Sequence, residues 1–342
     1  MKAAIVNPYL DTLGGGERYT AMVAKTLLES GYKVNIEWSD PGIIKKLEER
    51  FGLDLKGLSI VKDVERGESY DICFWVSDGS IPALKARKNV LHFQVPFHGV
   101  GGTSLMNKFK LARVNKVVCN SYFTKNVIDS EYGVESVVVY PPVATDKITP
   151  KRKQNIILSV GRFSQLKQAK RQDVLVRSFK SLYDQGFKEW RLILAGGVEV
   201  GVGNFLKELK KEAKRYPIEI VESASFEKLL QLYGKAKIFW SAAGFGVNEE
   251  KNPEAVEHFG ITVVEAMAAG AVPVVFRAGG HKEIVSKGET GFLWSEEKSL
   301  INYTKKLVEE KGLLTEMSKR SQKSSLVYEQ RRFVKEFEEI LN

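Results

Sequence analysis

The chain has 342 residues, enough for about two domains of ~150 residues, each with room for a core of its own. Its composition, 43% hydrophobic and 27% charged, is that of a folded globular protein and excludes extensive disorder. The net charge of +10 is unevenly distributed, since eight lysines and arginines but no acidic residue occur between Asp78 and Asp129. This stretch favours an anionic partner such as phosphate, nucleic acid or an acidic membrane, and a solvated basic surface is the alternative.

Several classes of protein are not expected. No apolar run is long enough for a transmembrane helix, and the N-terminal segment MKAAIVNPYL predicts a strand rather than a signal peptide. Cys73 and Cys119 lie in apolar strand-like segments, which indicates buried thiols in a reducing compartment. With four histidines, two cysteines and no Asp-x-Asp pair, a catalytic metal is not expected. We therefore expect a cytoplasmic protein that needs no metal or other cofactor.

Strand-like and helix-like segments alternate along the first half of the chain. Strands are predicted at residues 3–7, 33–37, 72–76, 90–93, 116–119 and 137–140. A helix is predicted between the first two strands, because Tyr19, Met22, Val23 and Leu27 recur at helical spacing, and Gly31 follows as its C-cap. The polar, proline-containing stretch 145–154 is the best candidate for a linker.

The same alternation restarts after this linker, with strands predicted at 156–160, 191–195, 218–221, 237–241 and 272–276. Alternating strands and helices indicate parallel sheets covered on both faces. We therefore predict an α/β protein of two doubly wound, Rossmann-like domains facing a cleft, at residues 1–148 and 149–325. Residues 326–342 are predicted to form an amphipathic helix that packs back on the first domain. Ligands in such sheets bind at the carboxyl ends of strands.

A triple glycine, Gly14 to Gly16, follows the first predicted strand and precedes the first helix. Glycines at this junction let backbone N–H groups approach an anion closely. The pattern is not G-x-G-x-x-G, and a flexible turn is the alternative reading.

Basic residues follow the first strand of the second domain. Gly161-Arg162 and then Lys170 stand near the carboxyl end of this strand, before an apolar helix. A diphosphate would suit this arrangement, since Arg offers a planar fork of donors and Lys a compact charge. Solvent-facing basic side chains are the alternative.

The most informative segment is EHFGITVVEAMAAG, residues 257–270, in which Glu257 and Glu265 stand eight residues apart. Glu265 lies inside an apolar helical run, where an unpaired carboxylate is costly, and no basic residue is within one helical turn of it. Ribose hydroxyls are good donors to such a carboxylate. Gly260 precedes the helix, so N–H groups near His258, Phe259 and Ile261 are free to bind oxygen atoms. A helix start with two incidental acids is the alternative.

This segment resembles the Glu-x7-Glu motif of retaining glycosyltransferases of the GT-B fold, family GT4. The similarity extends to GGGERY, CNSYFTKNVI, VVVYPPV and AGGHKEIVSKGETGFLW, and so covers nearly the whole chain. EHFG together with YPPV is most similar to the mannosyltransferases of lipid-linked oligosaccharide assembly, although His258 replaces the commoner glycine.

The resemblance implies that the second domain binds a nucleotide sugar, GDP- or UDP-linked, and that the first binds a saccharide or lipid-linked acceptor. Arg162 and Lys170 would bind the diphosphate, Glu265 the ribose and Glu257 the transferred sugar. Lys170 fits the family's spacing to a following Asp and Phe, so residues 164–169 are read as a loop insertion.

In the first domain, the resemblance implies that Gly15 and Gly16 approach the distal phosphate. It also implies that His92, at a strand's carboxyl end, lies near the transferred sugar, and a buried structural histidine is the alternative.

Residues 105–116 combine Leu105, Met106 and Phe109 with Lys108 and later basic residues, which is the composition of an interfacial helix. We expect this segment to contact an anionic membrane, so that the protein is peripheral on the cytoplasmic face. An amphipathic helix packed on the sheet is the alternative.

Two other functions compete with glycosyl transfer. The +10 charge suits a nucleic-acid-binding protein, but basic residues cluster near strand ends rather than among exposed aromatic residues, so no nucleic acid is expected. A nucleotide-sugar epimerase shares the GT-B architecture but would need different acid–base carboxylates.

Overall fold

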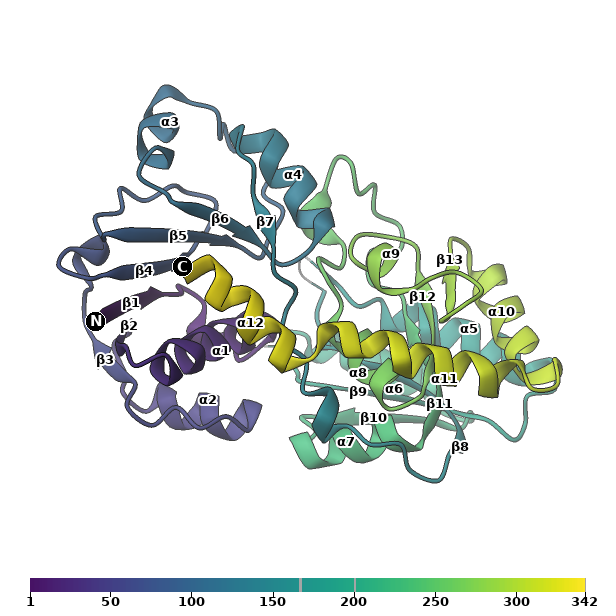
Figure 1. Cartoon of the computed structure of the whole chain (residues 1–342). Coiled ribbons are helices and arrows are strands. Elements are labelled where there is room, and N and C mark those ends of the chain that lie inside the picture. The colour runs from purple at the N-terminus through teal and green to yellow at the C-terminus, as the bar shows by residue number, and fades with distance from the viewer. Residues whose placement is uncertain (166–167, 200, 342) are drawn as a thin grey trace. The chain divides into compact units, whose positions relative to one another are not determined.

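The computed structural model describes residues 1–165, 168–199 and 201–341. They form two units: one contains Met1–Pro142 with the C-terminal helix α12 (Gln330–Leu341), and the other contains Val143–Glu329 (Figure 1). The chain passes between the units after Pro142 and after Glu329, whereas the sequence placed these junctions after residues 148 and 325.

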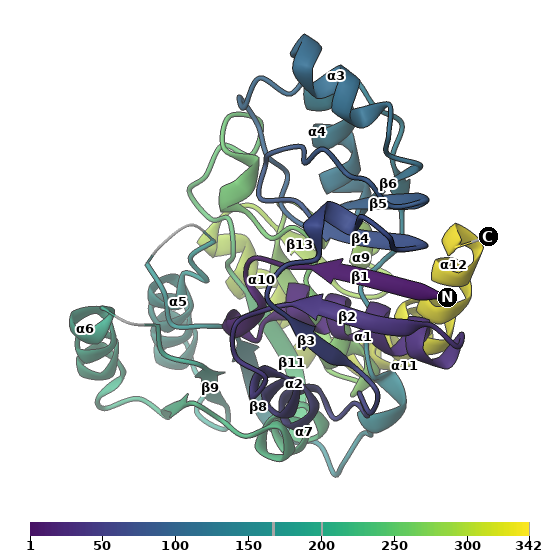
Figure 2. The same cartoon turned by 90° about the vertical axis from the view of Figure 1, so that its left-hand side faces the viewer.

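The first unit is built on a seven-stranded parallel sheet in the order β3-β2-β1-β4-β5-β6-β7, and Figure 2 shows β3, β2, β1, β4 and β5 in this succession. The strands are β1 Lys2–Val6, β2 Lys33–Glu37, β3 Ser59–Val61, β4 Ile72–Val76, β5 Lys88–Phe93, β6 Lys116–Cys119 and β7 Val137–Val138. The helices are α1 Gly15–Glu29, α2 Ile43–Phe51, α3 Leu105–Leu111, α4 Tyr122–Tyr132 and α12.

Apolar side chains cover both faces of this sheet. On one face, Ile5 and Phe74 of the strands pack in one core with Tyr19 of α1 and with Phe333 and Phe337 of α12. On the other face, a second core joins strand residues of β5 and β6 to α4. Burial of large apolar side chains, each contributing roughly 1.5–3 kcal/mol, therefore fixes α12 to the first unit although it ends the chain.

The second unit holds a six-stranded parallel sheet in the order β10-β9-β8-β11-β12-β13. Its strands are β8 Gln154–Val160, β9 Arg191–Gly196, β10 Ile218–Glu222, β11 Ala236–Ser241, β12 Val272–Phe276 and β13 Phe292–Trp294. Its helices are α5 Gln172–Asp184, α6 Gly203–Ala213, α7 Phe226–Lys235, α8 Ile261–Ala268, α9 His281–Ile284, α10 Glu297–Glu309 and α11 Leu313–Ser325. A core that includes Phe179, Trp240 and Trp294 joins α5, α6 and α10 to the sheet.

The predicted fold class is confirmed, since each unit is a parallel α/β sheet and each predicted strand is present with bounds close to those expected. The strands that the sequence did not predict are β3 and β13, three-residue strands at sheet edges. Cys73 and Cys119 are buried free thiols, and burial raises the pKa of each to about 12.

Lys153 lies in the polar stretch that the sequence predicts as a linker, but its side chain is held within the second unit. Its ammonium donates to the carbonyl oxygens of Ala236 and Ala269, at 2.7 and 2.6 Å. Burial lowers its pKa to about 8, and the side chain joins the start of β11 to the end of α8. Lys153 is therefore a structural lysine.

Candidate active site

An ion pair between Lys170 and Glu257 lies at the centre of the candidate site in the second unit. The Lys170 ammonium is 2.8 Å from Oε2 of Glu257, and the two side chains are only 20% and 17% exposed. Lys170 lies between β8 and α5, and Glu257 lies between β11 and α8. Because β8 and β11 are neighbours in a parallel sheet, their following loops meet at the same carboxyl edge.

Glycines allow Lys170 to lie against the end of β8. A Cβ atom on Gly161 would stand 2.8 Å from Cγ of Lys170, and a Cβ on Gly196, at the end of β9, would stand 2.0 Å from the Gly161 carbonyl oxygen. The Gln172 amide donates to the Arg162 carbonyl at 3.0 Å and so fixes the intervening turn. The close packing of β8, β9 and the Lys170 stem thus depends on two residues without side chains.

The segment that carries Glu257 is held by another pair of glycines, which follow β12. The Gly280 N–H donates to the Glu257 carbonyl at 2.8 Å. A Cβ on Gly279 would stand 2.0 Å from that same carbonyl oxygen, and one on Gly280 would stand 2.5 Å from the Phe259 backbone. The Gly279 N–H in turn donates to Glu249 at 2.8 Å, which ties the acidic loop before Glu257 to this turn.

Charge decides the protonation state of Glu257. Burial by itself would raise the pKa of this carboxyl, but the charge of Lys170 and the hydrogen bond from its ammonium lower it to about 2. The carboxylate is therefore ionised at every physiological pH and can accept hydrogen bonds only.

His281 begins α9 and is fully buried. Its Nδ1 lies 2.8 Å from the Phe276 carbonyl oxygen, and burial lowers the pKa of the ring, which is neutral at pH 7. Nδ1 therefore carries the proton, and Nε2 is a buried acceptor with no hydrogen bond within the described parts of the chain. The sequence left this histidine without a role.

His258, the residue at which the motif departs from glycine, is also buried. Both ring nitrogens lie within 2.7 Å of the Gln168 side-chain amide, and Nε2 is 3.1 Å from the Glu254 carbonyl oxygen. His258 thus links the Glu257 segment to the loop that leads to Lys170. The predicted insertion at 164–169 is described here except for residues 166–167.

Glu265 has a partner that the sequence did not reveal. It is 6% exposed on α8, and the Tyr233 hydroxyl of α7 donates to its Oε2 at 2.8 Å. Tyr233 is 32 residues away in sequence, so no local pattern could identify it. This hydrogen bond fixes the orientation of one carboxylate oxygen at the site.

The turn that precedes α8 needs a glycine. Gly260 adopts φ +114°, and Phe259 and Gly260 are buried before the helix begins at Ile261. The N-terminal amides of a helix carry partial positive charge and can bind oxygen atoms. Residues 258–261, all predicted as donor contacts, are thus brought together with Glu257 and Lys170 by this one turn.

The two arginines near the end of β8 behave differently. Arg162 is exposed, and its guanidinium makes no ion pair within residues 1–165, 168–199 and 201–341. Arg171 instead pairs with Asp173 through two hydrogen bonds of 3.0 Å and donates to the Phe245 carbonyl at 2.9 Å. Arg162 is therefore available to bind a ligand, whereas the guanidinium of Arg171 is held by contacts within the protein.

In the first unit, the predicted glycine contacts start α1. Gly15 is the first residue of this helix and is exposed. A Cβ on Gly16 would stand 1.9 Å from Oε1 of Gln94, so a larger residue here would force the Gln94 side chain, in the loop after β5, to move. Glu17 accepts the Gly14 N–H at 2.7 Å and closes the turn.

His92 lies on β5 and is fully buried. Its ring stacks on Tyr19 with the centroids 4.1 Å apart, and Nδ1 lies 3.1 Å from the Val118 carbonyl oxygen. Burial lowers the pKa of His92 to about 3, so the ring is neutral at pH 7. This packing matches the alternative reading of His92 as a buried structural histidine. The role of His92 beside the transferred sugar stays a prediction.

The residues that the structure describes contain neither a metal-binding cluster nor a membrane-spanning helix. They contain no cluster of three or more histidine, cysteine, aspartate or glutamate side chains placed to hold a metal ion. None of the described helices combines the length and hydrophobicity that crossing a bilayer requires.

Comparison with solved structures defines the class of fold. Anabaena HepE in complex with UDP aligns with a TM-score of 0.76 at 19% identity, covering 100% of this chain and 99% of that one. Sucrose-phosphate synthase from Thermosynechococcus elongatus aligns with a TM-score of 0.72 at 14% identity, covering 100% and 98%. The two parallel α/β units are those of the GT-B fold.

The family follows from the sequence model. The model described as "Glycosyl transferases group 1" matches residues 144–324, more than half of the chain. The protein therefore belongs to the family of group 1 glycosyl transferases.

Two relatives carry the same description, GDP-Man:Man(3)GlcNAc(2)-PP-Dol alpha-1,2-mannosyltransferase. The one from Dictyostelium discoideum is 28% identical over 248 residues, 67% of this chain and 46% of that protein. The one from Homo sapiens is 31% identical over 206 residues, 53% of this chain and 38% of that protein. The chain thus matches less than half the length of either relative.

Proposed function

We propose that the protein transfers a sugar from a nucleotide-sugar donor to a saccharide acceptor, and that the second unit binds the donor. The observation that carries this proposal is the partly buried Lys170–Glu257 pair beside the start of α8, with Arg162, which makes no ion pair among the described residues, close by in sequence. These groups at one sheet edge match a nucleotide sugar: a cation and helix N–H groups can bind the oxygens of its diphosphate, and a carboxylate can bind its hydroxyl groups.

Each side chain has a role in this proposal. Arg162 and Lys170 bind the diphosphate and stabilise the charge that develops on it when its bond to the sugar breaks. Glu257, ionised and acceptor-only, binds hydroxyl groups of the transferred sugar, and Glu265 accepts a ribose hydroxyl. The acceptor hydroxyl attacks the anomeric carbon, and its proton passes to the departing diphosphate. Two basic side chains replace a metal ion in this scheme, so no divalent cation is required.

GDP-mannose is the donor we favour, because the matching relatives in several organisms are described as GDP-mannose-dependent mannosyltransferases. Their description also supports a lipid-linked oligosaccharide as the acceptor. A UDP-linked sugar is the alternative donor within the same scheme.

Thermal denaturation with GDP-, UDP- and ADP-sugars tests the donor. A ligand at about 100 times its Kd stabilises the folded protein by about 2.7 kcal/mol. When all the sugars are compared at one concentration, the donor with the lowest Kd, which we expect to be GDP-mannose, should therefore raise Tm most. Glu265→Gln should reduce this shift. A UDP-sugar that gives the largest shift would replace GDP-mannose, and no shift with any of the sugars would refute donor binding.

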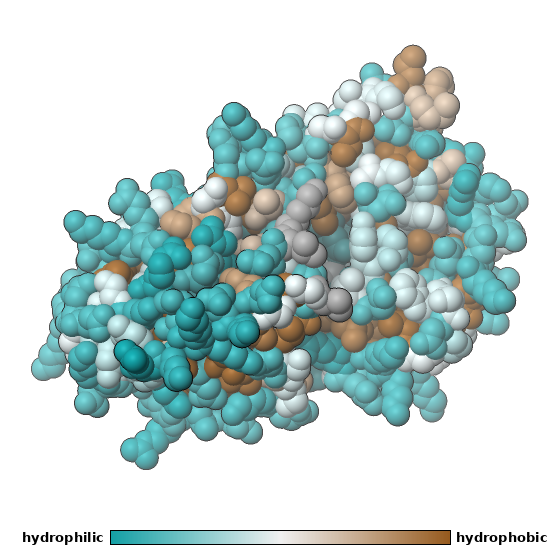
Figure 3. Space-filling model, turned by 180° about the vertical axis from the view of Figure 1, so that it is seen from behind, coloured by the Kyte–Doolittle hydropathy of each residue, from teal (hydrophilic) through white to brown (hydrophobic). Residues whose placement is uncertain are grey.

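We also propose that α3 contacts an anionic membrane surface, where a lipid-linked acceptor would be presented. No residue of α3 is buried, and Leu105, Met106 and Phe109 are 75%, 65% and 75% exposed. In Figure 3, hydrophobic side chains gather at the upper right, where α3 lies. The positive charge that anionic lipid attracts comes from the basic residues between Asp78 and Asp129, Lys108 and Lys110 among them. Each basic residue near an anionic surface contributes about 1 kcal/mol to the free energy of membrane binding.

Sedimentation with vesicles tests this contact. We expect binding to phosphatidylcholine vesicles that contain phosphatidylglycerol, weaker binding to pure phosphatidylcholine, and loss of binding in Leu105→Gln/Phe109→Gln. Val308→Gln, which replaces an exposed valine on α10, is the matched control. Equal binding by the double variant and the control would contradict the proposal.

A further inference from the structure

A single carboxylate holds the loop before α3 to the end of α4. The loop leads from β5 to α3, and Glu131 lies in the last turn of α4. Oε2 of Glu131 accepts the Gly99 N–H at 2.9 Å, and Oε1 accepts the N–H groups of Val100 and Gly102 at 3.0 and 3.2 Å. Three backbone donors of one loop therefore converge on one side chain of a neighbouring helix.

Glu131 is ionised at pH 7. Its side chain is only 12% exposed, and Nδ1 of His98 lies 3.5 Å from its Oε2. Burial by itself would raise the pKa of this carboxyl, but the hydrogen bonds from the N–H groups of Gly99, Gly102 and Val100 lower it. Hydrogen bonds to a charged group are stronger than those between neutral groups, so the carboxylate holds the loop more firmly than an amide would.

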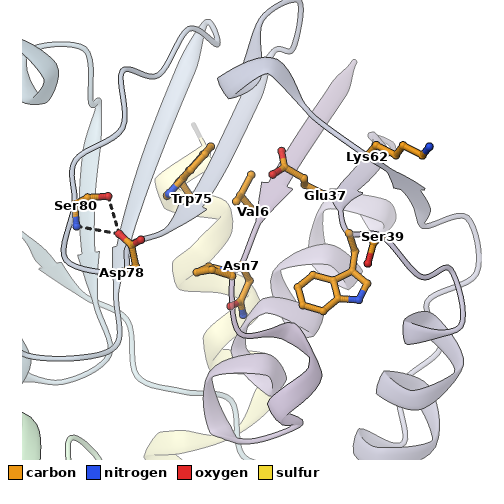
Figure 4. A pocket seen from close by; sticks show the side chains of 10 residues that line it. Val6, Asn7, Glu37, Ser39, Lys62, Trp75, Asp78 and Ser80 are labelled. Atoms are coloured by element: carbon orange, nitrogen blue, oxygen red, sulfur yellow. Dashed lines mark hydrogen bonds between the residues drawn. The ribbon is translucent and has the colours of Figure 1, made fainter.

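The same loop also packs closely against the end of α4. A Cβ on Gly102 would stand 2.5 Å from the Glu131 carbonyl oxygen and 2.7 Å from Cδ1 of Tyr132. Tyr132 is buried in the core that joins β5, β6 and α4, and its hydroxyl donates to the Gly79 carbonyl oxygen at 2.6 Å. A pocket of about 510 Å³ lies beside the turn that contains Gly79, as the labelled Asp78 shows in Figure 4. The loop is thus attached to a part of the unit that is itself fixed.

α3 depends on its two ends for its position. It has seven residues, none of them buried, and an isolated helix this short is marginally stable at best in water. Ser104 caps its start by accepting the Asn107 N–H, and the Ser104 N–H donates to the Gly101 carbonyl in the loop, both at 3.3 Å. Beyond the middle of the helix, Leu111 and Val114 pack partly against the core of β5, β6 and α4. The anchored loop therefore fixes one end of α3, and core contacts fix the other.

The anchored loop adds an apolar side chain to those that α3 presents. Val100 is 45% exposed and precedes the exposed Leu105 and Met106 of α3 by a few residues. Figure 2 shows α3 at the outer end of this unit, beyond α4. The basic residues of α3, Lys108 and Lys110, give this end of the unit the charge that complements anionic lipid.

A segment that is ordered before it binds loses less conformational entropy on binding. We infer that residues 98–111 form one preorganised element for contact with an anionic membrane, in which Glu131 is the positioning residue and Val100 is a direct contact. The inference rests on the proposed membrane contact of α3, and it adds the residue on which that contact depends.

Hydrogen–deuterium exchange and vesicle sedimentation of the whole chain with Glu131→Gln test the positioning role. The substituted amide keeps one acceptor oxygen but directs an NH2 group at a backbone donor. Amides of residues 99–111 should therefore exchange about tenfold faster, the equivalent of one lost charge-assisted hydrogen bond. Because α3 is only marginally stable, its disordered state should become populated, and binding to vesicles that contain phosphatidylglycerol should fall about fivefold.

The direction of this change separates positioning from charge. Removing a negative charge by itself strengthens attraction to anionic lipid, so weaker binding identifies a loss of order. Glu135→Gln is the matched control, because Glu135 is exposed just after α4, whereas the loop donors go to Glu131. This control should leave exchange unchanged and should not weaken vesicle binding. Slow exchange of β5 and β6 in both variants shows that the unit remains folded.

Val100→Gln tests the direct contact. It should weaken vesicle binding relative to Val308→Gln without faster exchange at Gly99 and Gly102, because the loop donors to Glu131 are backbone groups. Equal binding by these two valine variants would contradict the inference.

The inference and the membrane proposal can fail separately. If the wild-type protein binds vesicles but Glu131→Gln leaves exchange or binding unaltered, or acts no differently from Glu135→Gln, the inference is overturned and the contact of α3 stands. If the wild-type protein binds no vesicles, both are rejected.

Discussion

The carboxyl edges of the two sheets carry different chemistry on the same architecture. In the second unit, this edge holds an ion pair, the exposed Arg162 and the start of α8, packed around glycines. In the first unit, the corresponding edge holds two tryptophans and two carboxylates around an open pocket. The sheet provides the position in both cases, and the loops provide the ligand class.

This difference teaches how one fold can separate two substrates. The cations of the second unit favour an anionic ligand over an uncharged one, because an anion gives Arg162 and Lys170 charge-assisted hydrogen bonds. Substitutions in one unit should therefore leave ligand binding by the other unchanged, and each prediction below can break or sharpen this division.

The largest effect is expected from removing both cations of the second unit. Arg162→Ala/Lys170→Ala should weaken GDP-mannose binding more than 100-fold, since each charge-assisted contact contributes roughly 1.5–3 kcal/mol. Isothermal titration measures this loss. Arg191→Ala, at the opposite end of β9, is the control, and its donor affinity should stay unchanged. Donor affinity close to that of the wild type would place the diphosphate elsewhere.

A smaller effect, confined to the first unit, concerns acid stability. The folded-state pKa of His92, about 3, lies below the ordinary 6.5, so the unfolded chain binds a proton first as pH falls. Stability should therefore decrease below pH 6.5, by roughly 1.4 kcal/mol per pH unit once the unfolded histidine is protonated. Hydrogen exchange of β5 and α1 between pH 6.5 and 5 measures this loss. His92→Phe, which keeps the ring contact with Tyr19, should flatten the profile, and an unchanged profile would contradict the assignment.

Tyr233→Phe should have an effect of about 1 kcal/mol, because it removes the hydroxyl that orients Glu265. GDP affinity should fall about fivefold, as isothermal titration would measure. Tyr216→Phe is a matched control, since Tyr216 also donates to a carboxylate, Asp184, but at an exposed position. If both variants bind GDP equally well, Tyr233 does not position the ribose contact.

The smallest effect is expected from removing metal ions. Treatment with EDTA should change the rate of sugar transfer less than twofold, because Arg162 and Lys170 are proposed to stabilise the diphosphate. A rate that collapses in EDTA and returns with magnesium would show that these side chains do not suffice.

The sequence predicted the central strands well because they are continuous apolar runs, a direct consequence of burial on both faces of a parallel sheet. It failed at β3 and β13 because an apolar run of three residues or fewer is too short to indicate a strand. It also singled out the segment from Glu257 to Glu265, since a carboxylate such as that of Glu265 inside an apolar helix is conspicuous.

What the sequence by itself determined is therefore the class of fold and the residues that carry charge: two parallel α/β units, Arg162, Lys170 and the two glutamates. Tertiary structure alone decided which of these residues are paired, because Tyr233 meets Glu265 and Lys170 meets Glu257 across 32 and 87 residues. It also buried His92 and gathered Trp38, Trp75 and Asp78 around one pocket. Parallel strands bring distant loops to one edge, and a contact between such loops leaves no periodic signal in the chain.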